Sequence, residues 1–129
     1  MSTIAERVAA GAAFLDEHDP DWWRADAERA IDLDTLYQGS SHRCVLGQRC
    51  PLETLTAARQ AAGDGEWAIE RYDAYAAALF GADALDVEGS LAIRATELGF
   101  AWLGSSGNDA RFDDLTAEWK RLIEARRSA

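Results

Sequence analysis

"FDDLTAEWKRLI", residues 112–123, has the clearest helical pattern in the chain. Its apolar residues recur at intervals of three and four positions: Phe112, Leu115, Trp119, Leu122 and Ile123. Because an α-helix has about 3.6 residues per turn, this spacing places them on one face. Basic residues follow near the end of the stretch, where the helix dipole favours cations. The stretch therefore predicts an amphipathic helix whose apolar face lies in the protein core.

Apolar residues with helical spacing also recur along the rest of the chain, and no strand-hairpin pattern interrupts them. The longer predicted helices cover residues 2–17, 51–62, 69–80 and 83–98. Gly99 followed by Phe100 is typical of a left-handed helix end whose next residue packs back on the last turn. Shorter helices are predicted over 21–30 and 42–49, the second capped by Ser40 or Ser41.

These helices lead us to expect an all-α fold, a compact single-domain bundle of five or six helices over residues 1–129. A chain of 129 residues is long enough to bury a core without disulfides or metals. Residues 31–40 are expected to form an extended or turn-like connection. The glycine- and serine-rich stretch 103–109 is expected to be a flexible loop, and residues 125–129 a frayed C-terminus.

The chain carries a formal net charge of −10, which opposes binding to nucleic-acid phosphates or anionic membranes. No signal peptide and no apolar run of about eighteen residues is evident. We therefore expect a cytoplasmic protein that binds neither nucleic acid nor membrane directly. In such a reducing compartment the two cysteines are expected to be free thiols.

The stretch "DPDWW", residues 19–23, combines carboxylates with adjacent tryptophans. If this stretch is helical, Trp22 and Trp23 point about 100° apart and cannot both face one core. Since tryptophan is enriched at interface hot spots, we predict a partner-binding surface that includes Asp19, Asp21, Trp22 and Trp23. The competing interpretation is that a boundary tryptophan covers the edge of the core.

"SSHRCVLGQRCP", residues 40–51, holds both cysteines and one of the two histidines. His42, Cys44 and Cys50 are ligand types that zinc prefers, but a closed zinc site needs a fourth ligand. On a helix His42 and Cys44 would lie about 200° apart, so Cys44 is better explained as a small buried hydrophobe. Cys50 beside Pro51 is expected to be exposed. A nucleophilic thiol would need an activating base, and none is indicated, so we expect no catalytic residue and no cofactor.

The stretches "CVLGQ" (44–48), "ELGF" (97–100) and "FDDLTAEWKRLI" (112–123) lie at wide intervals along the chain. On these stretches the sequence resembles a family of small uncharacterised proteins of actinobacteria and their bacteriophages. In that family a C-x-x-C pair often precedes V-L-G-Q, and here Ser41 stands at the first cysteine position. The resemblance implies an accessory protein and brings no activity with it.

Our leading hypothesis is a non-enzymatic accessory protein that acts by binding a host or phage protein. One alternative is an acidic DNA mimic that occupies the basic groove of a DNA-binding protein, with carboxylates in place of phosphates. Another is a small zinc- or thiol-dependent protein centred on His42, Cys44 and Cys50. Acids gathered on one elongated face would favour mimicry, and a closed ligand cluster would favour metal binding.

Overall fold

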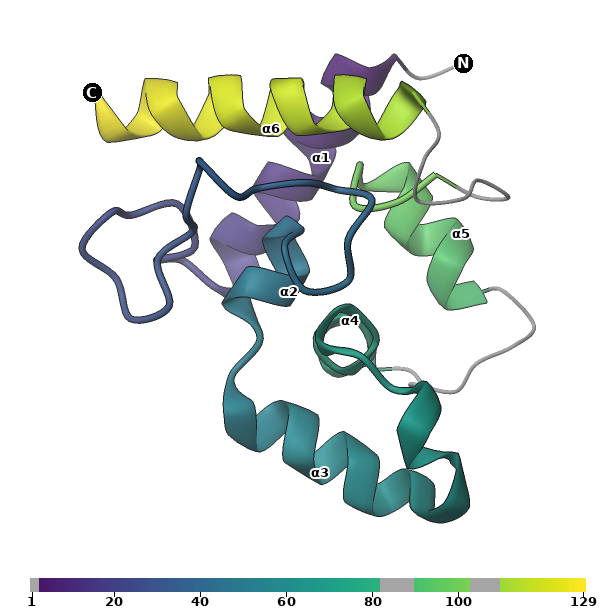
Figure 1. The fold of residues 1–129 in the computed structure, drawn as a ribbon. Coiled ribbons are helices and arrows are strands. Elements are labelled where there is room, and N and C mark those ends of the chain that lie inside the picture. The colour runs from purple at the N-terminus through teal and green to yellow at the C-terminus, as the bar shows by residue number, and fades with distance from the viewer. Residues whose placement is uncertain (1–2, 82–89, 103–109) are drawn as a thin grey trace.

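The computed structural model describes residues 3–81, 90–102 and 110–129 (Figure 1). In these ranges it has six α-helices and no strand, so the all-α prediction is confirmed. The elements are α1 (Ile4–His18), α2 (Val45–Arg49), α3 (Leu52–Ala62), the 3₁₀ helix η1 (Gly63–Ala68), α4 (Arg71–Phe80), α5 (Ser90–Glu97) and α6 (Ala110–Arg127). The predicted start of a helix near Asp83 and the predicted loop 103–109 lie outside the described residues.

The helices form two groups, which meet where α4 packs against α5. At one end α6 lies across α1, and α1 also packs against α5 (Figure 1). At the other end α4 packs against α2, α3 and α5. As a result α3 and η1 lie at the far end of the molecule from α6 (Figure 1).

The first helix begins with a capping box and packs closely on the end of α5. The Thr3 hydroxyl accepts from the Glu6 amide, and the Glu6 carboxylate accepts from the Thr3 amide, each at 3.1 Å. One turn later Gly11 lies so close to α5 that a Cβ built there would be 2.0 Å from the Leu98 carbonyl oxygen. A glycine at this position therefore allows the two helices to approach.

The helix end predicted after α5 is confirmed. Gly99 has a φ of 73°, in the left-handed region, and the Phe100 amide donates to the Ala95 carbonyl at 2.9 Å. This turn sends Phe100 back into the core, where its ring stacks on Trp119 at a centroid distance of 5.4 Å. The Trp119 indole nitrogen in turn donates to the Gly99 carbonyl at 2.7 Å. The turn thus joins α5 to the centre of α6.

The apolar face predicted for α6 is also confirmed, since Phe112, Leu115, Trp119 and Ile123 are buried. The helix continues through Arg127, beyond the start of the frayed end that we expected over 125–129. The Arg127 guanidinium explains this, because it donates to the carbonyls of Trp23 and Ile31, each at 2.8 Å.

The predicted helix over 21–30 is wrong, because residues 19–44 form one irregular segment of successive turns. Arginine side chains from α2 and α6 bind backbone carbonyls of this segment. In addition to Arg127, Arg49 donates to the carbonyls of Glu28 at 2.7 Å and Arg29 at 3.2 Å. Long-range hydrogen bonds therefore replace local helical ones in this segment.

Buried Gln38 anchors the second half of this segment. Its side-chain oxygen accepts from the Val45 amide at 2.8 Å, and its side-chain nitrogen donates to the Phe100 carbonyl at 3.3 Å. The Gln38 backbone amide donates to the Thr116 hydroxyl of α6 at 2.9 Å. The prediction of an extended or turn-like connection over 31–40 agrees with this arrangement.

Candidate functional site

Asp19, predicted to contact a partner, is part of an internal ion pair. Its side chain is 12% exposed and accepts two hydrogen bonds from Arg49, at 2.7 and 2.9 Å. The Tyr75 hydroxyl of α4 donates to the same carboxylate at 2.8 Å. Asp19 thus links the irregular segment to α2 and α4, and its prediction as a partner-binding residue is not supported by its position.

Two opposing influences act on the Asp19 carboxyl. Burial, the largest, would raise its pKa, but hydrogen bonds from Arg49 and Tyr75 hold the pKa below its usual value. Arg49 is itself buried, and its bonds to Asp19 hold the guanidinium in its charged form against the effect of burial. The pair is therefore charged at neutral pH and depends on both members.

We expect stability to depend on Asp19 in acid. A carboxyl whose pKa is lower in the folded than in the unfolded chain contributes stability above the unfolded value of about 3.9. That contribution is lost as pH falls through the folded value. Urea unfolding followed from neutral pH to about pH 2 should show this loss, and Asp19→Asn should show a shallower decline than the wild type. Parallel curves for the two proteins would contradict the assignment.

Trp22 is fully buried, so its prediction as a partner contact is wrong. Its ring meets Trp119 edge-on at a centroid distance of 5.5 Å, and its indole nitrogen donates to Asp16 at 3.0 Å. A tryptophan with a packed ring and a bonded nitrogen belongs to the core.

Trp23 and Asp21 remain at the surface. Trp23 is half-buried, with the Arg24 guanidinium 5.3 Å from its ring centroid. Asp21 is exposed and pairs with Arg24 at 3.4 Å. Two of the four residues predicted to bind a partner therefore reach the surface: Trp23, which is covered by Arg24, and Asp21, which is exposed to solvent.

The structure separates the residues of the proposed zinc or thiol site. His42 lies at the surface and pairs with Glu70 at 2.9 Å, whereas Cys44 and Cys50 are buried free thiols. The expectation that Cys50 is exposed is therefore wrong. In the ranges that the structure describes, no group of three histidine, cysteine or carboxylate side chains is placed to hold a metal ion.

Cys44 has a structural role at the start of α2, where Ser40 or Ser41 was expected to cap the helix. Its sulfur accepts from the Gly47 amide at 3.3 Å. A Cβ on Gly47 would lie 2.3 Å from the Ser41 carbonyl oxygen, so the chain turns tightly around this glycine. Burial raises the pKa of Cys44 to about 12, and it also raises that of Cys50, so both thiols are protonated at neutral pH.

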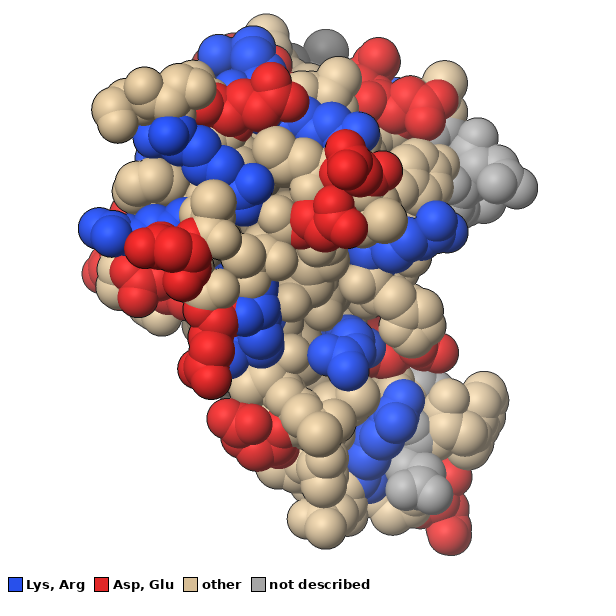
Figure 2. Space-filling view, turned by 60° about the vertical axis from the view of Figure 1, so that its left-hand side comes forward, with Lys and Arg blue, Asp and Glu red and all other residues tan. Residues whose placement is uncertain are grey.

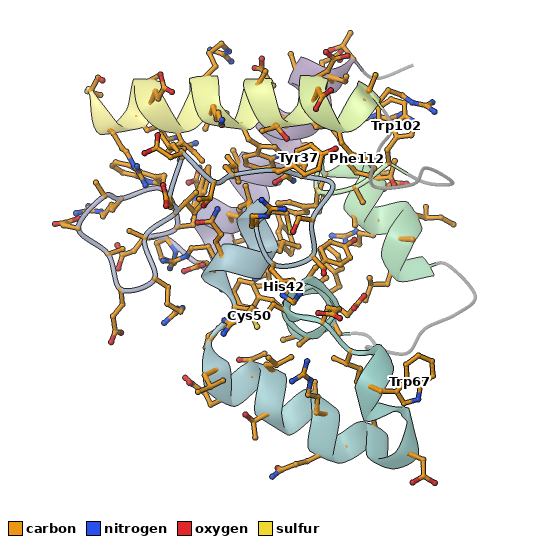
Figure 3. The ribbon with its side chains drawn as sticks, viewed as in Figure 1. Tyr37, His42, Cys50, Trp67, Trp102 and Phe112 are labelled. Atoms are coloured by element: carbon orange, nitrogen blue, oxygen red, sulfur yellow. The ribbon has the colours of Figure 1, made fainter. Side chains whose placement is uncertain are left out.

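The most exposed large apolar side chain of the described residues is one that sequence reasoning missed. Trp67, in η1, is 82% exposed, and Figure 3 shows its side chain pointing outward from the element, away from Trp102 and Phe112. We call residues 52–68, which comprise α3 and η1, the α3–η1 arm. Leu52, at the other end of α3, is 63% exposed. The arm thus carries an exposed apolar side chain at each end.

Most of the α3–η1 arm faces solvent. Leu55 is the one buried residue of α3, which packs against η1 and α4. The exposed residues of α3 include a single charged side chain; they are Leu52, Glu53, Thr56, Ala57, Gln60 and Ala61. Arg59 of α3 is partly exposed, and η1 adds the exposed carboxylate of Asp64.

Elsewhere the acidic side chains do not form a continuous surface on the face shown in Figure 2. Arginine and lysine side chains are interspersed among the carboxylates there. A DNA mimic requires an uninterrupted row of acids, so this face offers no support for mimicry.

Among the described residues, no helix is both long enough and apolar enough to cross a membrane. Comparisons of the chain with protein-family models, with curated proteins and with solved structures give no match.

Proposed function

We propose that this chain is a non-enzymatic binding protein that engages a protein partner through the α3–η1 arm, with Trp67 as the principal contact. The exposure of Trp67 carries this proposal. A tryptophan buries about 150–250 Å² when it is covered, and tryptophan is enriched among residues that dominate binding energy. In the free chain the Trp67 ring stays in water, so the free energy of burying it is not obtained. A partner that covers the ring would gain this free energy on binding.

The composition of the arm supports the same function. Cores of protein interfaces are depleted in charge, and the exposed surface of α3 has Glu53 as its one charged residue. The partner surface that fits is an apolar pocket wide enough for an indole ring. The resemblance to actinobacterial and phage proteins suggests a host or phage protein as the source of that surface.

The state of the two thiols favours binding over thiol catalysis. Cys44 and Cys50 are buried and have raised pKa values, whereas a nucleophilic cysteine needs a lowered one and an accessible sulfur. Neither thiol meets these conditions.

Trp67→Ala should abolish partner binding and leave the fold intact. We expect a loss of affinity of at least roughly thirtyfold, typical of a hot-spot residue, because the exposed ring contributes little to the free chain. The measurement compares proteins captured from an actinobacterial lysate on immobilised wild type and variant, followed by titration of the captured protein. Trp23→Ala is the matched control and should retain binding. Equal capture by wild type and Trp67→Ala would contradict the proposal.

The salt dependence of binding separates this function from DNA mimicry. Contacts centred on the Trp67 ring should persist when ionic strength rises, because salt screens charges and not apolar burial. A mimic should lose affinity steeply over the same range, since its binding depends on charge.

A further inference from the structure

A pocket of about 170 Å³ lies between the irregular segment, α4 and the start of α6. The side chains that bear on its chemistry are those of Gln38, Cys44, Tyr72, Phe100, Ala101 and Phe112. None of these residues belongs to the α3–η1 arm. The pocket is therefore a separate feature from the protein-binding surface proposed above.

The walls of this pocket are aromatic and uncharged. Tyr72, Phe100 and Phe112 supply three rings, and no described lining residue carries a formal charge. The polar groups of Gln38 are used within the protein, since its amide bonds to Val45 and Phe100. An ion entering this space would find no counter-charge among the described lining residues, which disfavours charged ligands.

The wall also holds the hydroxyl groups of Ser40, Ser41 and Tyr72. The Tyr72 hydroxyl has no hydrogen-bond partner among the residues that the structure describes and is not sealed from water, so it is available to a ligand. Burial raises the pKa of Tyr72 well above its usual value, so the hydroxyl keeps its proton. It can therefore donate one hydrogen bond to an acceptor oxygen.

We propose that this pocket binds a small uncharged aromatic molecule, about one ring in size, whose acceptor oxygen bonds to Tyr72. The size follows from the volume: an apolar cavity of about 150 Å³ in another protein binds benzene. A ring in this pocket would lie among the three aromatic side chains, which favour offset or edge-on contact with it. The pocket is thus a ligand site between the irregular segment, α4 and the start of α6.

The test is titration of the full-length chain with acetophenone, which has one ring and one carbonyl, followed by two-dimensional amide NMR and calorimetry. We expect saturable shifts centred on residues 38–41, 72 and 100–101. Benzoate, of the same size but charged, should bind at least about tenfold more weakly because its charge must be desolvated. Absence of saturable binding, equal binding of benzoate, or shifts centred elsewhere would each overturn the proposal.

Two variants identify the site. Tyr72→Phe should weaken acetophenone binding by roughly threefold to tenfold, the contribution of one hydrogen bond, and should leave toluene binding unchanged. Ala101→Phe should fill the pocket and remove binding of both; if it fails to fold, the Tyr72→Phe comparison decides alone. Equal losses for acetophenone and toluene in Tyr72→Phe would contradict the hydrogen bond, and unchanged affinities for both would contradict the site.

Discussion

Replacing Asp19 with alanine should lower the free energy of unfolding by about 3–5 kcal/mol. The reason is that Arg49 is almost completely buried, and its guanidinium would lose the carboxylate that compensates its charge. The Tyr75 hydroxyl would lose its acceptor in the same substitution. Removal of one member of a buried ion pair is costly because the remaining charge stays in the interior.

Asp21→Ala is the matched control for Asp19→Ala. Asp21 lies two residues away but is exposed, so its replacement should change the free energy of unfolding by less than about 0.5 kcal/mol. A double variant, Asp19→Ala with Arg49→Met, should recover part of the loss because no buried charge remains. Denaturant unfolding measures all three. Similar values for Asp19→Ala and Asp21→Ala would contradict the internal role of Asp19.

Trp22→Ala should cost about 3–5 kcal/mol of stability, the range for removal of a large buried aromatic side chain. It leaves a cavity beside Trp119 and deprives Asp16 of the indole hydrogen bond. Thermal unfolding followed by near-ultraviolet circular dichroism should show a lower melting temperature and loss of the signal from the packed tryptophan pair.

The surface residues Trp67 and Trp23 provide the comparison for the buried Trp22. Trp67→Ala should change stability by less than about 0.5 kcal/mol, since the ring contacts mainly solvent. Trp23→Ala should fall between the two because that ring is half-buried. A stable Trp22→Ala, or a strongly destabilised Trp67→Ala, would contradict the division of the tryptophans into core and surface.

The helices were predictable because their information is local. Apolar spacing alone places Leu115, Trp119 and Ile123 on the buried face of α6, and Gly99 marks the end of α5. These features depend on residues a few positions apart, which the sequence displays directly.

The irregular conformation of residues 21–30 was not predictable in the same way. This conformation depends on guanidinium groups of Arg49 and Arg127, which lie far along the chain from the carbonyls they bind. Helix propensity of the alanine-containing stretch 21–30 was overridden by these contacts. For the same reason, Asp19 and Trp22 could not be recognised as interior groups from their neighbours.

The sequence contains one indication of the candidate site that our sequence analysis did not use. Trp67 lies in "GDGEW", residues 63–67, between the end of one helical pattern and the start of the next. A tryptophan outside both apolar stripes has no helical face to bury it. The adjacent pair Trp22 and Trp23 was chosen as the binding candidate instead, although Trp22 lies in the core.

The most direct test of the proposed function is capture of partners from one lysate on immobilised wild type, Trp67→Ala and Trp23→Ala, quantified by mass spectrometry. The account predicts a set of proteins that wild type and Trp23→Ala retain and that Trp67→Ala loses, with Trp67→Ala melting at the wild-type temperature. Retention of the same set by Trp67→Ala would show that the α3–η1 arm is not the binding surface.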